Sequence, residues 1–132
     1  MQISADLAAQ AEVALAKMEI HDLICAQARA VDRGDTSLLR SLWAPGATVD
    51  AGEFYTGDVP GFCDLMLETA RDLRRMSHTV SNEWIQVDGD TAVAESYVIA
   101  IATAVTDDGD QDTLTGGRYI DRYQRLNGAW KC

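Results

Sequence analysis

Hydrophobic residues recur every three to four positions over residues 4–33, a spacing that predicts an amphipathic helix. Ser4 is suited to cap its start and Gly34 to end it. The pattern leaves open whether this segment is one long helix or two helices with a break near Lys17. A second helix is predicted over residues 37–43. A third helix, with Pro60 in its first turn, is predicted to run to about residue 74.

The pattern changes to alternation after Arg75, which predicts strands. Two short strands are expected between the helices, at residues 47–50 and 53–56. Three long strands and the start of a fourth are expected later, at residues 76–87, 91–105, 112–126 and 129–132. Asn127-Gly128 is a strong signal for a tight hairpin turn. Gly116-Gly117 predicts a bulge or a close backbone approach within the third long strand.

Helices followed by a meander of strands predict a single α+β domain over residues 1–132. N-terminal helices would pack on a curved antiparallel sheet and enclose a pocket. The last strand is much shorter than its partner. We therefore expect either a short final strand or a truncated C-terminus.

Charge and composition narrow the class of partner. The 132-residue chain has 21 acidic and 11 basic residues and a formal charge of -10, which disfavours nucleic acid and anionic membranes as partners. Three scattered cysteines without CxxC spacing predict neither a disulfide framework nor a zinc site, and they favour a cytoplasmic location. The acidic run 107–110 lacks the full calcium-loop spacing, so we expect no metal.

The most informative stretch is residues 75–84, which holds one of the two histidines. With a period of two, His78, Val80, Asn82 and Trp84 would share one face of the strand. This mixture is too apolar for a solvent-exposed face and too polar for a plain core. The stretch therefore predicts one wall of a pocket.

Five local patterns in consistent order carry a family resemblance: residues 20–24 with 30–35, 42–49, 77–82, 119–123 and 127–131. With these motifs the chain resembles the NTF2-like superfamily, specifically the SnoaL-like branch that includes scytalone dehydratase and hexachlorocyclohexane dehydrochlorinase. The resemblance implies a cone-shaped α+β barrel around a deep apolar cavity.

The resemblance also implies a buried catalytic pair, which falls on Asp32 and His78 in this sequence. A carboxylate near a helix C-terminus is disfavoured by the helix dipole, so an inward-facing Asp32 needs a partner. An imidazole held by a carboxylate keeps one nitrogen free as a base. Taken without the resemblance, His78 is a hydrogen-bonded wall residue, and Asp32 can equally be an exposed residue at the helix end.

Several residues are expected to contact a substrate: Asn82, Trp84, Val80, Gln27, Tyr97 and Tyr119. Gln27 stands where the dehydrochlorinase has a basic residue, and Val31 stands where scytalone dehydratase has a tyrosine. The resemblance therefore implies the base but not the substrate. His21, beside Asp22 on the first helix, is expected at the surface or at an interface.

We therefore expect a cofactor-independent lyase, of dehydratase or dehydrochlorinase type, acting on a small, mainly apolar, cyclic or aromatic substrate. One alternative is an isomerase or polyketide cyclase of the same fold, in which Asp50 would be the base. The other is a non-catalytic small-molecule-binding or assembly module. A homo-oligomer, dimer or trimer, is expected through the apolar strand 91–105.

Overall fold

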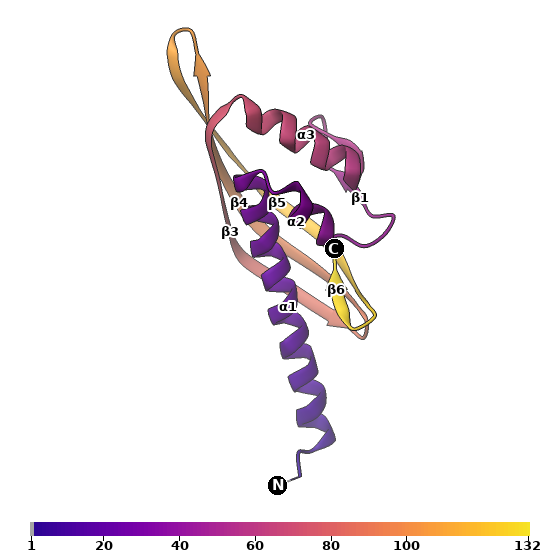
Figure 1. Ribbon diagram of the computed structural model, residues 1–132. Helices are drawn as coiled ribbons and strands as arrows, with labels where there is room; N and C mark the ends of the chain where they lie inside the picture. Colours follow the sequence, from indigo (N-terminus) through magenta and orange to yellow (C-terminus); the bar gives the residue numbers. More distant parts are fainter. Residues whose placement is uncertain (1) are drawn as a thin grey trace.

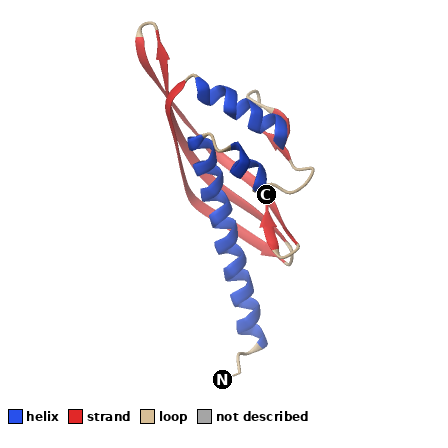
Figure 2. Ribbon diagram, in the orientation of Figure 1, coloured by secondary structure: helices blue, strands red, loops and turns tan. Residues whose placement is uncertain are grey.

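The computed structural model describes residues 2–132 and places three helices on one face of a curved sheet (Figure 1). The described residues form α1 (Ala5–Arg33), α2 (Thr36–Ser41), β1 (Thr48–Asp50), β2 (Thr56–Asp58), α3 (Val59–Arg71), β3 (Leu73–Asp88), β4 (Thr91–Thr106), β5 (Gly109–Leu126) and β6 (Ala129–Lys131). Figure 2 shows the helices as one layer against the long strands, and the three helices precede the long strands along the chain, as the sequence predicts for an α+β fold.

α1 is one continuous helix of 29 residues, so the break considered near Lys17 does not occur. At its start the Ser4 hydroxyl oxygen accepts a hydrogen bond from the Leu7 amide at 3.2 Å. At its end Gly34 adopts a left-handed conformation with φ 64°, which glycine reaches without steric cost. No helix within residues 2–132 is both long enough and apolar enough to cross a lipid bilayer.

The main sheet has the strand order β3-β4-β5-β6, and every pair is antiparallel. β4 and β5 pair without interruption from Thr91–Gln124 to Thr106–Gly109. The predicted bulge at Gly116-Gly117 is therefore wrong, and a side chain there would meet no closer neighbour than a carbonyl oxygen at 4.0 Å. The sheet does not close, because β1 and β2 form a separate hairpin.

A bulge in β3 divides its inner face into two parts. The pairing with β4 shifts between Ser81 and Trp84, and Asn82 has a φ of 54°. Because one added residue reverses the alternation, Ile85 rather than Trp84 turns toward the helices. The prediction that His78, Val80, Asn82 and Trp84 share one face is wrong beyond the bulge, and Trp84 is 62% exposed.

Two buried clusters hold the helices on the sheet. The first joins α1 to the inner face of the sheet through Ala16, Ile20, Ile24, Ala92, Ala94, Tyr123 and Trp130. The second joins the three helices through Ala30, Leu39, Val59, Phe62 and Cys63. Together they fix the orientation of α1, which carries one half of the predicted catalytic pair.

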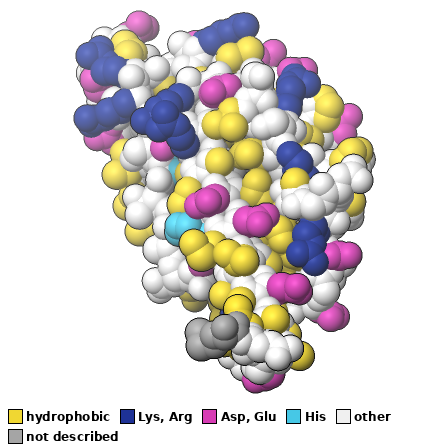
Figure 3. Space-filling model, turned by 60° about the horizontal axis from the view of Figure 1, so that its bottom comes forward, with side chains coloured by type: hydrophobic (Ala, Val, Ile, Leu, Met, Phe, Trp, Pro, Cys, Tyr) yellow, Lys and Arg dark blue, Asp and Glu magenta, His cyan; other side chains and the backbone are white. Residues whose placement is uncertain are grey.

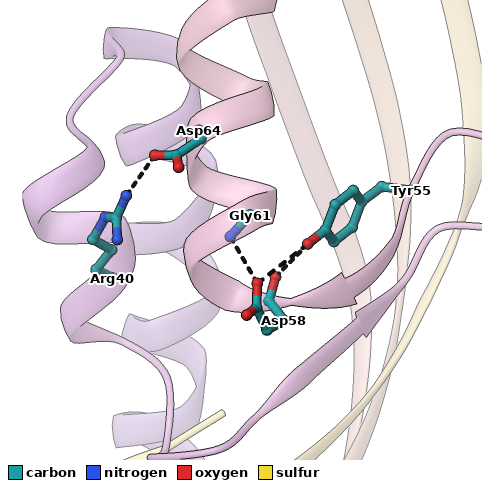
Figure 4. A network of polar contacts seen from close by, with 5 residues as sticks. All are labelled: Arg40, Tyr55, Asp58, Gly61 and Asp64. Carbon is teal, nitrogen blue, oxygen red and sulfur yellow. Dashed lines mark hydrogen bonds and ion pairs between the residues drawn. The ribbon is translucent and has the colours of Figure 1, made fainter.

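Polar contacts fix α3 at the edge of the helix layer (Figure 4). Asp58 caps the helix by accepting from the Gly61 amide at 2.8 Å, and the Tyr55 hydroxyl donates to the Asp58 carbonyl at 2.7 Å. Arg40 of α2 pairs with Asp64 of α3 at 2.6 Å. The predicted short strand at residues 53–56 begins three residues later, because a turn occupies the preceding positions.

The outer face of the sheet, away from the helices, carries exposed apolar side chains. The exposed apolar residues on this face are Trp84, Val93, Tyr97, Ile99, Ile101, Leu114 and Ile120. Register places them on the face opposite Ala92, Ala94 and Val98, which are buried. An apolar patch of this kind on a soluble protein is typical of an interface.

We propose that this outer face joins copies of the chain, as the apolar strand predicts. Ile99→Lys places a charge in the middle of the patch and is expected to shift the protein to a smaller assembly. Leu67→Lys on α3 is the matched control, since Leu67 is a partly exposed apolar residue away from this face. Analytical ultracentrifugation measures the outcome, and a monomeric wild-type protein would contradict the proposal.

Candidate active site

Asp32 and His78 meet where the last turn of α1 crosses β3. Asp32 Oδ1 lies 2.6 Å from His78 Nδ1, and Asp32 Oδ2 accepts a hydrogen bond from the His78 backbone N–H at 3.0 Å. Both side chains are largely buried, with 14% of the His78 side chain and 18% of the Asp32 side chain exposed. One carboxylate therefore binds both the ring and the backbone of a single residue.

This contact defines the state of the imidazole ring. An ionised carboxylate only accepts hydrogen bonds, so Nδ1 of His78 must be the donor. In the neutral ring the other nitrogen, Nε2, then carries a lone pair. His78 is also one of the residues that line the cavity.

An open cavity of about 1660 Å³ is lined by residues of the helix layer and the sheet, and its lining includes Val93 and Ile120 of the outer face. Its apolar wall includes Ile24, Ala28 and Val31 of α1 and Phe62 and Met66 of α3. The segment from Trp43 to Ala51 lines another side. Polar and apolar side chains both line this space, and a concave space of this size is large enough for a small organic molecule.

The structure brings only some of the predicted substrate contacts to this cavity. Gln27 and Tyr119 line it. Val80 packs against the core beneath α1 instead. Asn82 and Trp84 are exposed because the β3 bulge turns them away, and these two assignments are corrected.

Tyr97 is also misplaced by the sequence prediction. It lies on the outer face of β4, where it is 49% exposed and pairs in register with Arg118. Alternation along β4 points its neighbours Ser96 and Val98 inward and Tyr97 outward.

A polar group on the inner face of β5 was not predicted as part of the site. Asp121, Tyr123 and the final residue Cys132 all line the cavity. Burial raises the pKa of the Asp121 carboxyl to about 6 and that of the Cys132 thiol to about 12. Burial also raises the pKa of Tyr119, with the Asp121 and Asp32 carboxylates adding to it.

Two polar atoms at the cavity have no hydrogen-bond partner within the described residues. They are the indole Nε1 of Trp43 and the Tyr123 hydroxyl, both buried, and the Tyr123 hydroxyl lies beside the Asp121 carboxyl and the Cys132 thiol. A buried donor without a partner costs free energy, about 1–3 kcal/mol, unless a ligand or water satisfies it. The sequence prediction missed Asp121 and Tyr123 as site residues, although the alternation of β5 places both on the same face as the core residue Ala94.

Asp50, the base in the isomerase alternative, also lines the cavity. Its Oδ1 atom accepts from the Gly52 amide at 3.0 Å and from the Thr56 hydroxyl at 3.3 Å. These contacts use the carboxylate to hold the β1–β2 turn. Asp50 therefore has a structural task that His78 Nε2 does not have.

Known proteins resemble this chain in family and in fold. The family model described as SnoaL-like domain matches residues 12–132. This chain belongs to the SnoaL-like family. No curated protein sequence matches it.

Among solved structures, the chain is similar to hexachlorocyclohexane dehydrochlorinase LinA-type3 from Novosphingobium barchaimii, with 22% identity, a TM-score of 0.80, and coverage of 92% of this chain and 84% of that one. It is also similar to a candidate scytalone dehydratase from Novosphingobium aromaticivorans, with 21% identity, a TM-score of 0.80, and coverage of 92% and 82%. The Kfla4162 protein from Kribbella flavida gives 19% identity, a TM-score of 0.79, and coverage of 87% and 84%. These likenesses establish the SnoaL-like, NTF2-like fold.

The buried carboxyl of Asp121 predicts a pH-dependent cost to stability. Its pKa is higher in the folded protein than in an unfolded chain, so protonation favours the folded state. The free energy of unfolding should therefore fall as the pH rises from about 4 to about 6, and Asp121→Asn should remove this fall. We expect the variant to be roughly 3 kcal/mol more stable than wild type at neutral pH and nearly equal to it at about pH 4.

Urea unfolding at several pH values measures this difference. Asp108→Asn is the matched control, because it removes the same charge from an exposed hairpin. An equal gain from both substitutions would attribute the effect to net charge and contradict the role of burial.

Proposed function

We propose that this SnoaL-like protein is a cofactor-independent lyase that catalyses a dehydratase-type elimination. The observation that carries the proposal is the 2.6 Å contact between Asp32 and His78 at the wall of a cavity. It supplies a base with a defined tautomer and a carboxylate that stabilises the imidazolium formed when the base takes a proton.

The proposed reaction uses His78 as the group that moves the proton. Nε2 takes a proton from a carbon next to an electron-withdrawing group, and the electron pair of that C–H bond forms the new double bond. The bond from the neighbouring carbon to its hydroxyl oxygen breaks. The proton on His78 then joins the departing oxygen, so that water leaves and the imidazole returns to its neutral form.

The cavity supports a small, mainly apolar substrate, cyclic or aromatic in shape. Its apolar wall, which includes Ile24, Val31, Phe62 and Met66, suits a ring. Asp121, with its raised pKa, is the second group in the cavity able to supply a proton near neutral pH.

The comparisons support an elimination only at the level of fold. The names of two similar structures, a dehydrochlorinase and a candidate dehydratase, both describe eliminations. The isomerase alternative depends on Asp50, which the β1–β2 turn already uses. The binding-module alternative predicts that a ligand is retained without turnover and that His78 is dispensable.

The dyad is tested with His78→Gln and Asp32→Asn. Both are expected to keep the fold and to lower kcat by about a hundredfold or more, since each removes proton transfer or the group that directs it. The assay is loss of water, followed by mass spectrometry, from a panel of cyclic β-hydroxy ketones. Full turnover by a well-folded His78→Gln protein would refute the dyad.

Proton abstraction can be separated from loss of water. In deuterated water, a cyclic ketone without the hydroxyl group should exchange its α-hydrogen in the presence of wild-type protein and not with His78→Gln. Asp50→Asn should retain at least about half of this exchange, because Asp50 is assigned to the turn. Loss of exchange in Asp50→Asn with retention in His78→Gln would favour the isomerase alternative.

A further inference from the structure

A second histidine–carboxylate contact joins α1 to β3, with the roles of helix and strand exchanged. His21 of α1 lies with Nδ1 at 2.6 Å from Glu83 Oε2 of β3. On the other side of the ring, His21 Nε2 is 3.5 Å from the Cys25 sulfur. Figure 3 shows a histidine side chain at the surface beside acidic and hydrophobic side chains. The proposed dehydratase chemistry uses none of these three residues.

Helix and bulge geometry bring these groups together. His21 and Cys25 are four residues apart, so they occupy the same face of α1. Asp32 is eleven residues from His21, or three helical turns, which places the two contacts about 16 Å apart along the same stripe of the helix. Glu83 reaches α1 because it belongs to the β3 bulge, next to the left-handed Asn82.

We propose that His21, Cys25 and Glu83 form a binding site for a divalent transition-metal ion of zinc type. Imidazole nitrogen, thiolate sulfur and carboxylate oxygen are the donors that zinc takes in proteins. One donor atom from each residue lies within 4.8 Å of the other two. Water would complete a four-coordinate ion on the solvent side.

Distances support this assignment. Tetrahedral zinc bonds of about 2.1 Å to nitrogen and 2.3 Å to sulfur place those two donors roughly 3.6 Å apart. The observed separation between His21 Nε2 and Cys25 Sγ is 3.5 Å. Two of the three ligands are therefore already at coordination spacing, and the carboxylate of Glu83 lies on the other side of the imidazole ring, 2.6 Å from Nδ1.

The surroundings favour a cation. Asp22 adds a further carboxylate beside the cluster in a chain whose formal charge is -10. A shallow pocket of about 380 Å³ beside His21 and Glu83 gives an ion a route from solvent.

The site is separate from the proposed catalytic cavity. None of His21, Cys25 and Glu83 is among the residues that line that cavity. A bound ion would fasten the middle of α1 to the bulge of β3. The sequence prediction of no zinc site considered only the spacing of the cysteines, and the structure places Cys25 at the surface beside His21.

Cobalt(II) is a suitable probe, since it occupies zinc sites and gives a thiolate charge-transfer absorption in the near ultraviolet when bound to cysteine. The full chain, reduced and without an affinity tag, is titrated with cobalt and then with zinc. We expect one equivalent of cobalt, a thiolate band, and displacement by zinc. Cys25→Ser and Cys25→Ala should both lose the band, and His21→Gln and Glu83→Gln should each weaken binding by about tenfold or more.

Matched controls separate the site from general charge and thiol effects. Asp22→Asn removes a neighbouring charge without removing a proposed ligand, and Cys63→Ser removes a thiol elsewhere, so both should keep the band and the affinity. His78→Gln should also keep them, which makes the result independent of the proposed lyase activity. A thiolate band that survives in both Cys25 variants, or no band in the wild-type protein at millimolar cobalt, would overturn the proposal.

Discussion

The hydrogen bonds between Asp32 and His78 are the constraint on which the arrangement of this molecule depends. Asp32 lies in the last turn of α1, where the helix dipole opposes a negative charge, so its burial requires compensation. The carboxylate obtains it from two donors of one residue, the backbone N–H and the ring Nδ1–H of His78. The same contact fixes the end of α1 against β3 and leaves the imidazole oriented toward the cavity.

The bulge in β3 is the second constraint, and it acts through the period of the strand. Before the bulge, His78 and Val80 face the helices; after it, Ile85 and Val87 do. One added residue thus lets a wall that carries His78 and an apolar core wall follow each other along one strand. It also turns Glu83 toward His21, which creates the second contact between the same two elements.

The proposed base and the groups that would select a substrate come from different parts of the fold. The base is built at the crossing of α1 and β3, whereas Asp121 and Tyr123 lie on β5 and Trp43 follows α2. In the proposed reaction, proton transfer and substrate selection therefore rest on different elements of the fold.

The sequence by itself determined the order of helices and strands, the Ser4 and Gly34 ends of α1, and the pairing of Asp32 with His78 through its family resemblance. Periodicity and capping depend on residues that are close in the sequence, so they can be recognised from the sequence alone. Only the tertiary structure decided the faces of Asn82, Trp84 and Tyr97, because one left-handed residue reverses all later alternation in β3 and because β4 has two apolar faces. Only the tertiary structure showed that Glu83 contacts His21 and that Asp121 lines the cavity. These segments are far apart in the sequence, so no local pattern predicts that they meet.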